Sequence, residues 1–574
     1  MRFIHICTAS ALAVAVAGCA SQSPGEDERI VVTGSKASRS DNNSQTALPA
    51  PPPPPSPALQ TAPAYAAEAV ADGVVSGSRV KAVPPSYRYI PPVIVPGPTD
   101  RERYDGEEVS PVKIAAAEPV STFSVDVDTG AYANSRRFLS QGQMPPKAAV
   151  RTEEFINYFR YDYERPLDRS QPFSVSFDAA RTPWNADTRL IRIGLAGYDI
   201  ERDERPPANL VFLMDVSGSM NSPDKLPLVK TALAGLAGEL QPRDTVSIVV
   251  YAGAAGLVLE PTSDTRAIRA ALDRLRAGGS TAGGAGLELA YRIAEDNFID
   301  GGVNRVILAT DGDFNVGVQS RDALIEMIEK KRDSGITLTT LGFGTGNYNE
   351  AMMEQIANHG NGNYAYIDSA LEAKKVLGDE MSSTLFTIAK DVKIQVEFNP
   401  AVISQYRLIG YENRALRDED FDNDAVDAGD IGAGHQVTAI YEVVPVGAKG
   451  WIADRRYGDK LPAAATSMIE EAAYVKLRYK LPDGDKSTLI DYVMPTSSLR
   501  NASAPRGDFA FATAVAGFGQ KLRADPLLEG FSYRDLVKLA GRQHNYWRQE
   551  FIKLASLAGG LLDEDGPRTM QGGK

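Results

Sequence analysis

The chain has 574 residues, enough for several independent hydrophobic cores, because domains average about 150 residues. Asp and Glu outnumber Lys and Arg by 74 to 61, which gives a formal charge of −13 and excludes the basic excess that binding to a nucleic-acid backbone requires. The only cysteines, Cys7 and Cys19, lie near the N-terminus, so the body of the chain can form neither a disulfide framework nor a CxxC zinc site.

The first residues predict export. A short segment containing Arg2 precedes an apolar stretch over residues 9–17, which is typical of a secretory signal and too short to span a hydrocarbon core about 30 Å thick. The sequence Val-Ala-Gly-Cys at residues 16–19 then resembles a bacterial lipobox. That resemblance implies a lipoprotein signal peptide over residues 1–18 and a lipid on Cys19. We therefore expect a lipid-anchored protein of the bacterial cell envelope that faces the periplasm or the cell surface; the alternative is an ordinary signal peptide cleaved elsewhere.

Residues 19–103 are predicted to be a disordered tether. Fourteen of the 36 prolines lie between Pro49 and Pro98, and proline-rich sequence favours extended chain that cannot bury a core. Within this stretch, residues 30–35 (IVVTGS) resemble a short segment near the mature N-terminus of TonB-dependent receptors. Chance similarity is the alternative, and the sequence leaves open whether this segment contacts TonB.

An N-terminal α+β flanking domain is predicted over residues 104–205. Residues 123–128 alternate between polar and apolar side chains as in a strand, and residues 129–140 and 151–161 have the apolar spacing of helices. Two further strands are predicted over residues 173–178 and 189–195.

Strands and helices alternate regularly from residue 206 to residue 385. Continuous apolar runs at 210–214, 246–251, 303–309 and 336–343 are typical of strands buried on both faces. Helices are predicted between them over residues 225–240, 265–276, 285–297, 321–334, 349–358 and 369–385. This order predicts an α/β unit with a doubly wound, mostly parallel sheet, whose binding site lies at the carboxyl ends of the strands.

The remaining chain returns to short alternating strands. Residues 386–500 are predicted to be a β-rich C-terminal domain, with strands over 392–398, 406–411, 436–444, 473–481 and 487–494. Because residues 173–195 have the same character, we expect the two flanks to form one antiparallel sandwich around the inserted α/β unit. Residues 501–574 are predicted to be a helical region, with helices near 508–523, 533–542 and 547–558.

Oxygen-bearing side chains follow three elements of the α/β unit. Asp215, Ser217 and Ser219 come directly after its first strand, Thr281 opens its third helix, and Asp311 follows the strand at 303–309. The topology brings these positions to one edge of the sheet. Carboxylate and hydroxyl oxygens suit a hard cation such as Mg²⁺. A Ser/Gly turn that caps a helix would explain the first motif alone, but not the three together.

The motif DxSxS, a later Thr and a later Asp at these points resemble the metal-ion-dependent adhesion site of von Willebrand factor type A (VWA) domains, which have a Rossmann-like fold. The resemblance covers residues 206–385 and implies that Asp215, Ser217, Ser219, Thr281 and Asp311 bind Mg²⁺, with Mn²⁺ or Ca²⁺ as alternatives. An acidic side chain of a protein partner would then complete the coordination. The flanks widen the resemblance to the YfbK-type bacterial VWA lipoproteins. A metal with a structural role only, or a vestigial site, is the alternative.

Other candidate sites have weaker patterns. Asp420, Asp422 and Asp424 have the spacing of a calcium loop, but Ala425 replaces its turn glycine and Ile431 its bidentate Glu, so an acidic surface loop is expected. The motifs HExxH, GxSxG and GxxxxGK[ST] do not occur. We therefore predict a partner-binding protein and not an enzyme, with a metal-dependent hydrolase or a purely structural envelope protein as alternatives. The sequence leaves the partner and the oligomeric state open.

Overall fold

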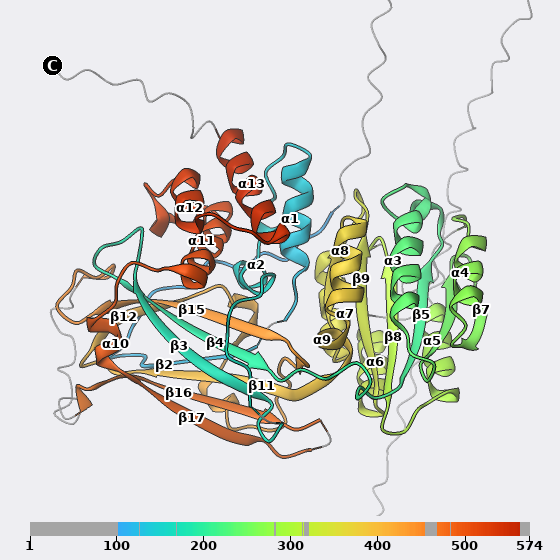
Figure 1. Cartoon of the computed structure of the whole chain (residues 1–574), viewed down its shortest axis with the longest axis horizontal. Helices are drawn as coiled ribbons and strands as arrows, with labels where there is room; N and C mark the ends of the chain where they lie inside the picture. Colours follow the sequence, from blue (N-terminus) through green and yellow to red (C-terminus); the bar gives the residue numbers. More distant parts are fainter. Residues whose placement is uncertain are drawn as a thin grey trace, which may run out of the picture. The chain divides into compact units, whose positions relative to one another are not determined.

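The computed structural model describes residues 102–562, except 126, 168, 280–282, 313, 315–320, 454–467 and 483. These residues form three β-sheets with helices packed against them (Figure 1). The predicted signal peptide, Cys19, nearly all of the predicted tether, and Thr281 lie outside the described residues. Within the described part of the chain, no helix is long and apolar enough to cross a membrane.

One sheet has six strands and contains the predicted α/β pattern. In spatial order its strands are β10 (Tyr364–Ile367), β9 (Ile336–Phe343), β8 (Val303–Thr310), β5 (Ala208–Asp215), β6 (Thr245–Tyr251) and β7 (Ala255–Thr262). All neighbouring pairs are parallel except β6 and β7. The prediction of a mostly parallel, doubly wound sheet is thus confirmed, although β7 and β10 are not predicted from the sequence.

Helices cover both faces of this sheet. Successive strand residues point to opposite faces, so Leu210 and Phe212 belong to a core shared with α3 and α4, whereas Val211 and Leu213 belong to a core shared with α5, α6 and α7. These helices are α3 (Leu226–Glu239), α4 (Thr265–Arg274), α5 (Gly283–Asp296), α6 (Arg321–Asp333) and α7 (Glu350–His359).

The helix predicted over residues 369–385 is interrupted. It consists of α8 (Ala370–Lys374), a π-helix, η3 (Lys375–Asp379), and α9 (Met381–Leu385). At the start of the π-helix, the buried Lys375 donates to Glu380 over 3.0 Å and lies 4.0 Å from the centre of the Tyr158 ring. π-Turns of this kind occur mostly as short interruptions of α-helices, and the apolar spacing of the sequence does not reveal them.

The other two sheets pack face to face as a sandwich. The first has the order β1 (Lys113–Ile114), β12 (Ile403–Ile409), β15 (Gln436–Pro445), β4 (Arg189–Gly197) and β3 (Phe173–Arg181). The second has the order β13 (Ala415–Leu416), β2 (Val120–Ser124), β11 (Thr387–Phe398), β16 (Glu471–Lys480) and β17 (Thr488–Pro495). Aromatic pairs connect the sheets: the ring centres of Phe173 and Tyr479 are 5.1 Å apart, and those of Phe177 and Tyr492 are 5.6 Å apart.

Each sandwich sheet contains strands from both sides of the α/β unit. β4 pairs antiparallel with β15, and β2 pairs antiparallel with β11. This confirms that the two flanks form one antiparallel sandwich around an inserted α/β unit. The boundaries of the six predicted segments stay a prediction.

Five helices cover the outer face of the first sandwich sheet. Their shared core contains Leu190 and Ile440 from that sheet together with Phe155, Phe518 and Phe551 from the helices. The helices are α1 (Gly130–Ser140), α2 (Thr152–Asn157), α11 (Gly507–Leu522), α12 (Tyr533–Ala540) and α13 (Tyr546–Leu561).

The remaining short elements are η1 (Lys147–Ala149), η2 (Gly218–Asn221), η4 (Glu412–Arg414), η5 (Asp418–Asp420), β14 (Ile431–Gly432), α10 (Thr496–Arg500) and η7 (Pro526–Leu528).

A buried arginine joins the α/β unit to these helices. Arg136 of α1 is 5% exposed and donates to both oxygens of Asp368 over 2.6 and 2.7 Å and to Glu372 over 2.7 Å. It also donates to Glu550 of α13 over 3.0 Å and to the Tyr158 hydroxyl over 2.8 Å. Since Asp368 and Glu372 lie at the end of the α/β unit, one guanidinium connects three parts of the fold.

Candidate metal site at the carboxyl edge of the parallel sheet

Two buried carboxylates lie at the carboxyl ends of neighbouring parallel strands. Asp215 is the last residue of β5, and Asp311 follows β8, whose Ala309 lies beside Met214 in the register. Both aspartates are 0% exposed. The edge predicted from the order of the strands therefore carries two acidic side chains that are excluded from bulk water.

Hydrogen bonds hold Asp215 in a fixed orientation. Its Oδ1 accepts from the Ser217 amide over 2.8 Å, and its Oδ2 accepts from the hydroxyls of Thr310 and Tyr251 over 3.1 and 3.2 Å. Burial raises the pKa of Asp215, the hydrogen bonds from Ser217 oppose that rise, and the nearby charge of Asp311 adds to it. A cation at this position would favour the ionised form of both carboxylates.

The two serine hydroxyls of the first motif are adjacent. Ser217 Oγ and Ser219 Oγ are 2.9 Å apart, at the start of the short turn η2. Two backbone hydrogen bonds join this turn to the loop before α5: the Gly218 amide donates to Gly279 over 3.0 Å, and the Gly278 amide donates to Val216 over 2.8 Å. The loop that leads to Thr281 is thus fixed beside the serines.

The residue after Asp311 has to be a glycine. Gly312 has a φ of +87°, and a Cβ atom there would lie 2.4 Å from the backbone nitrogen of Asn349. This close approach places the chain after Asp311 against the start of α7.

A lysine that no sequence motif indicates, Lys225, contacts the site. Lys225 Nζ donates to Asp311 Oδ2 and to Asn347 Oδ1, each over 2.9 Å. Tyr251 and Thr310 were missed as well. The sequence offers one signal for Tyr251. This residue ends β6, the strand beside β5, and it lies beside Asp215 in the register of the two strands.

The structure brings together four of the five predicted metal ligands. Asp215, Ser217, Ser219 and Asp311 lie at one edge of the sheet, and Thr281 lies outside the described residues. The donors are two carboxylates and two hydroxyls, which fit a hard divalent cation. Among the described residues, no group of three or more His, Cys, Asp or Glu side chains could hold a metal ion, so hydroxyl oxygens would have to take part in binding.

The predicted acidic loop after β13 does not converge on a cation. Asp420 accepts both of its 2.8 Å hydrogen bonds from Arg417, Asp422 pairs with Arg478, and Asp424 accepts from Ser487. Asp420 is nevertheless 7% exposed, so the description as a surface loop fits the other two aspartates only.

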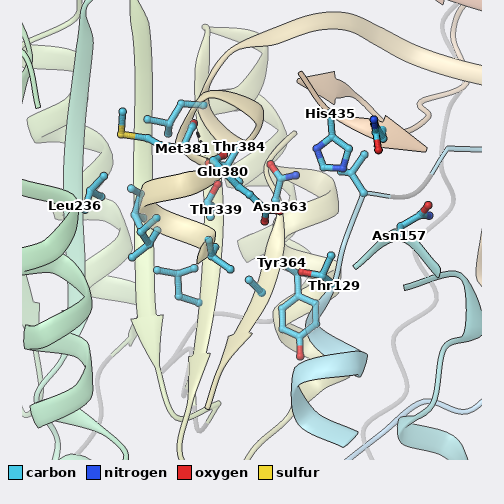
Figure 2. A pocket seen from close by; sticks show the side chains of 18 of the residues that line it. Thr129, Asn157, Leu236, Thr339, Asn363, Tyr364, Glu380, Met381, Thr384 and His435 are labelled. Atoms are coloured by element: carbon cyan, nitrogen blue, oxygen red, sulfur yellow. Dashed lines mark hydrogen bonds between the residues drawn. The ribbon is translucent and has the colours of Figure 1, made fainter. Parts of the chain in front are cut away.

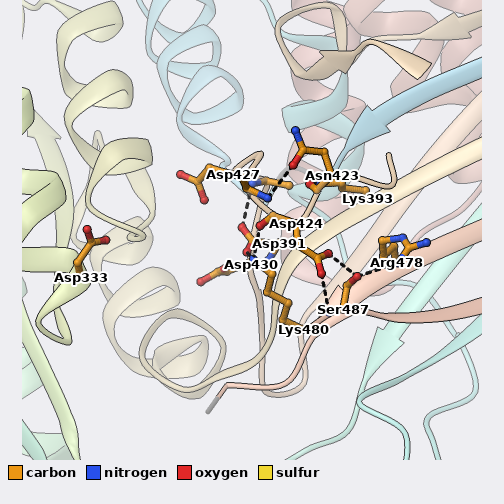
Figure 3. A network of polar contacts seen from close by, with 12 residues as sticks. Asp333, Asp391, Lys393, Asn423, Asp424, Asp427, Asp430, Arg478, Lys480 and Ser487 are labelled. Carbon is orange, nitrogen blue, oxygen red and sulfur yellow. Dashed lines mark hydrogen bonds and ion pairs between the residues drawn. The ribbon is translucent and has the colours of Figure 1, made fainter. Parts of the chain in front are cut away.

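A polar cluster that includes Asp391, Asp427 and Asp430 lies beside this loop (Figure 3). Asp391 pairs with Lys480 over 2.7 Å, and its backbone amide donates to Asp430 over 3.2 Å. Burial, together with the charge of Asp391, raises the pKa of Asp430 to about 7 and that of Asp427 to about 6. The cluster is far from the predicted metal ligands in sequence and shares no residue with them.

A small cavity lies between the α/β unit and the sandwich. Its volume is about 40 Å³, and Figure 2 shows Tyr364, Glu380, Met381 and His435 around it. It is large enough for water molecules, whereas pockets for organic ligands usually exceed about 300 Å³.

The chain is similar to known proteins in several regions. Three family models match the chain: "von Willebrand factor type A domain" at residues 209–379, "Uncharacterized protein YfbK, C-terminal" at 383–561, and "von Willebrand factor" at 98–192. VWA domains generally mediate protein–protein interactions and hold a divalent metal at a site of this kind. The solved von Willebrand factor type A protein from Catenulispora acidiphila is 18% identical, with a TM-score of 0.36, over 67% of this chain and 88% of that chain.

Two relatives show how far the similarity extends. The protein sll0103 of Synechocystis is 34% identical over 187 residues, which are 32% of this chain and 43% of that protein. YfbK of Escherichia coli (strain K12) is 46% identical over 474 residues, which are 80% of this chain and 82% of that protein. Because the similarity to YfbK spans the VWA domain and both flanks, the chain belongs to the YfbK family of VWA-domain proteins.

Proposed function

We propose that this protein is a lipid-anchored protein of the bacterial cell envelope that binds a protein partner through a divalent metal at the VWA site. Asp215, Ser217, Ser219, Thr281 and Asp311 would hold the metal, and an Asp or Glu of the partner would complete its coordination. The observation that carries the proposal is the pair of fully buried carboxylates, Asp215 and Asp311, at the carboxyl edge of the sheet.

The donor set favours Mg²⁺, with Mn²⁺ or Ca²⁺ as alternatives. When bound, the metal would supply an open coordination position that attracts a carboxylate. The residues of this chain provide the fixed frame: hydrogen bonds from Tyr251 and Thr310 orient Asp215, and burial strengthens its attraction for a cation.

Binding, not catalysis, is the role that these contacts support. Among the described residues, Tyr251, Thr310 and Lys225 donate to the two carboxylates, and each side chain is engaged in that hydrogen bond. A general base or nucleophile would have to be available to a substrate. Turnover of a substrate that Ser217→Ala abolishes would instead support a metal-dependent hydrolase.

The experiment is a pull-down from envelope extract with the tagged full-length protein. We expect a partner that is captured in Mg²⁺ and lost in EDTA, and lost with Asp311→Ala although circular dichroism shows a folded protein. Asp296→Ala, which changes an exposed aspartate of α5, is the matched control and should capture the partner normally. Capture that withstands both EDTA and Asp311→Ala would refute metal-mediated binding. A lowered melting temperature in EDTA with unchanged capture would indicate a structural metal.

The lipid anchor needs a separate test. Labelling cells with a radioactive fatty acid should label the wild type and not Cys19→Ala. The same label on Cys19→Ala would refute lipidation at this residue.

A further inference from the structure

A positive charge is built into the predicted metal site. Lys225 precedes α3, is 6% exposed, and places its ammonium 2.9 Å from Asp311 Oδ2. The same ammonium donates to Asn347 Oδ1, in the loop between β9 and α7, over 2.9 Å. A predicted metal ligand is thus already paired with a cation of this chain.

The loop after β9 is shaped to hold the lysine. Gly344 has a φ of +73°, and a Cβ atom there would lie 2.3 Å from Lys225 Cγ and 2.4 Å from its Cε. The Gly344 carbonyl accepts a 2.6 Å hydrogen bond from the hydroxyl of Tyr366, which fixes this part of the loop. The stem of Lys225 therefore lies directly against the backbone of this loop.

Lys225 changes the formal charge that the site would have with a divalent cation bound. Asp215 and Asp311 carry two negative charges, which a divalent cation alone would neutralise. With Lys225 included, these three described side chains have a formal charge of −1 without metal and +1 with it. A carboxylate from a partner would return the occupied site to neutrality. In a buried site, a net charge without a counterion is unfavourable.

We propose that Lys225 weakens metal binding in the free protein and thereby couples metal binding to the capture of a carboxylate. Each ligand raises the affinity for the other, because only the two together leave the site neutral. This inference rests on the proposed function, since it assigns a regulatory role to one residue of the same site.

The test is a calorimetric titration with Mn²⁺ of the wild type and of Lys225→Met, which keeps the stem and removes the charge. We expect Lys225→Met to bind Mn²⁺ about tenfold or more tightly than the wild type, since it removes a positive charge adjacent to the ion. Replacing chloride by acetate at equal ionic strength should increase the Mn²⁺ affinity of the wild type several-fold and that of Lys225→Met less.

Two variants serve as controls. Lys230→Met removes a lysine of α3, the helix that follows Lys225. The ammonium of Lys230 donates to the backbone of Leu275, and this variant should bind Mn²⁺ as the wild type does. Lys225→Gln provides a second neutral side chain if Lys225→Met does not give a folded protein by circular dichroism.

The outcomes separate this inference from the proposed function. Equal or weaker Mn²⁺ binding by the neutral variants, or no binding by any protein, overturns the role of Lys225. Tighter binding by the neutral variants together with an equal acetate effect refutes the coupling. If Lys225 acts as expected but partner capture is insensitive to EDTA, the inference stands and the proposed function fails.

Discussion

Arg136 is the side chain whose loss should most disturb the connection between the α/β unit and the helices around it. Arg136→Met keeps much of the apolar stem and removes the guanidinium. Three carboxylates, on Asp368, Glu372 and Glu550, then lose their common counterion at 2.6–3.0 Å, and the Tyr158 hydroxyl loses a donor.

The size of the effect follows from the burial of the partners. The side chains of Asp368 and Glu372 are 10% and 1% exposed, so water can replace little of the lost interaction. Removing one partner of a buried ion pair typically costs 3–5 kcal/mol, and we expect a loss of about 4 kcal/mol at neutral pH. The loss should be smaller at about pH 5. Burial raises the pKa of Glu550 and Arg136 opposes that rise, so without Arg136 the folded variant binds a proton on Glu550 more readily in acid and loses stability as the pH increases.

The assay is urea unfolding followed by circular dichroism at about pH 8 and about pH 5. Arg165→Met is the matched control, because Arg165 pairs with Asp199 on the surface, where the side chains are 45% and 54% exposed. Such exposed pairs contribute about 0.2–1 kcal/mol. A loss below about 1 kcal/mol for Arg136→Met, or a loss that is larger at the lower pH, would show that Arg136 does not act as the shared counterion.

Three further predictions concern the site and the polar cluster. Gly312→Ala should lower the free energy of unfolding by about 3 kcal/mol, because the new Cβ would clash with Asn349. Gly447, at a φ of +90° with nothing within 4 Å of a Cβ, is the control, and Gly447→Ala should lower that free energy by only about 1 kcal/mol. Equal losses for the two variants in urea unfolding would contradict the clash. Asp430 has a pKa raised to about 7, so the folded protein keeps a proton that the unfolded chain releases near pH 4, and stability falls as the pH rises between these values. One pKa unit corresponds to about 1.4 kcal/mol, so between about pH 4 and about pH 8 the wild type should lose about 3–4 kcal/mol more than Asp430→Asn, and parallel pH profiles would contradict this. Adding Mg²⁺ should raise the melting temperature of the wild type but not that of Asp311→Asn, and an equal rise in both would place the metal elsewhere.

The sequence predicts best the parts of the fold that are buried on both faces. Residues 336–343 were predicted as a strand with the bounds that β9 has, because a continuous apolar run is required between two helical layers. The edge strand β7 was missed, since its side chains are half-buried without a clear alternation. The helix α2 ends at Asn157, earlier than predicted, and the side chain of Asn157 pairs there with Tyr411 and with the amide of Thr438.

The sequence predicts those site residues whose positions follow from the order of the strands in the sheet. Asp215 and Asp311 follow neighbouring parallel strands, and the order of strands places them together. Lys225 was not predictable in this way, because its contact depends on the path of a loop. Its partner Asn347 lies 122 residues further along the chain, and no periodicity or motif connects the two.

The interleaved sandwich has a consequence for the order in which the chain can fold. β3 and β4 are synthesised before the VWA domain, but β15, which completes their sheet, comes after it. The VWA domain is continuous in sequence and can fold as soon as it is complete. Until residue 445 has been made, β4 presents an unpaired edge, which is the kind of surface that leads to aggregation. A growing chain therefore passes through a stage in which its central domain is finished while the edge of the surrounding sheet still has to be protected.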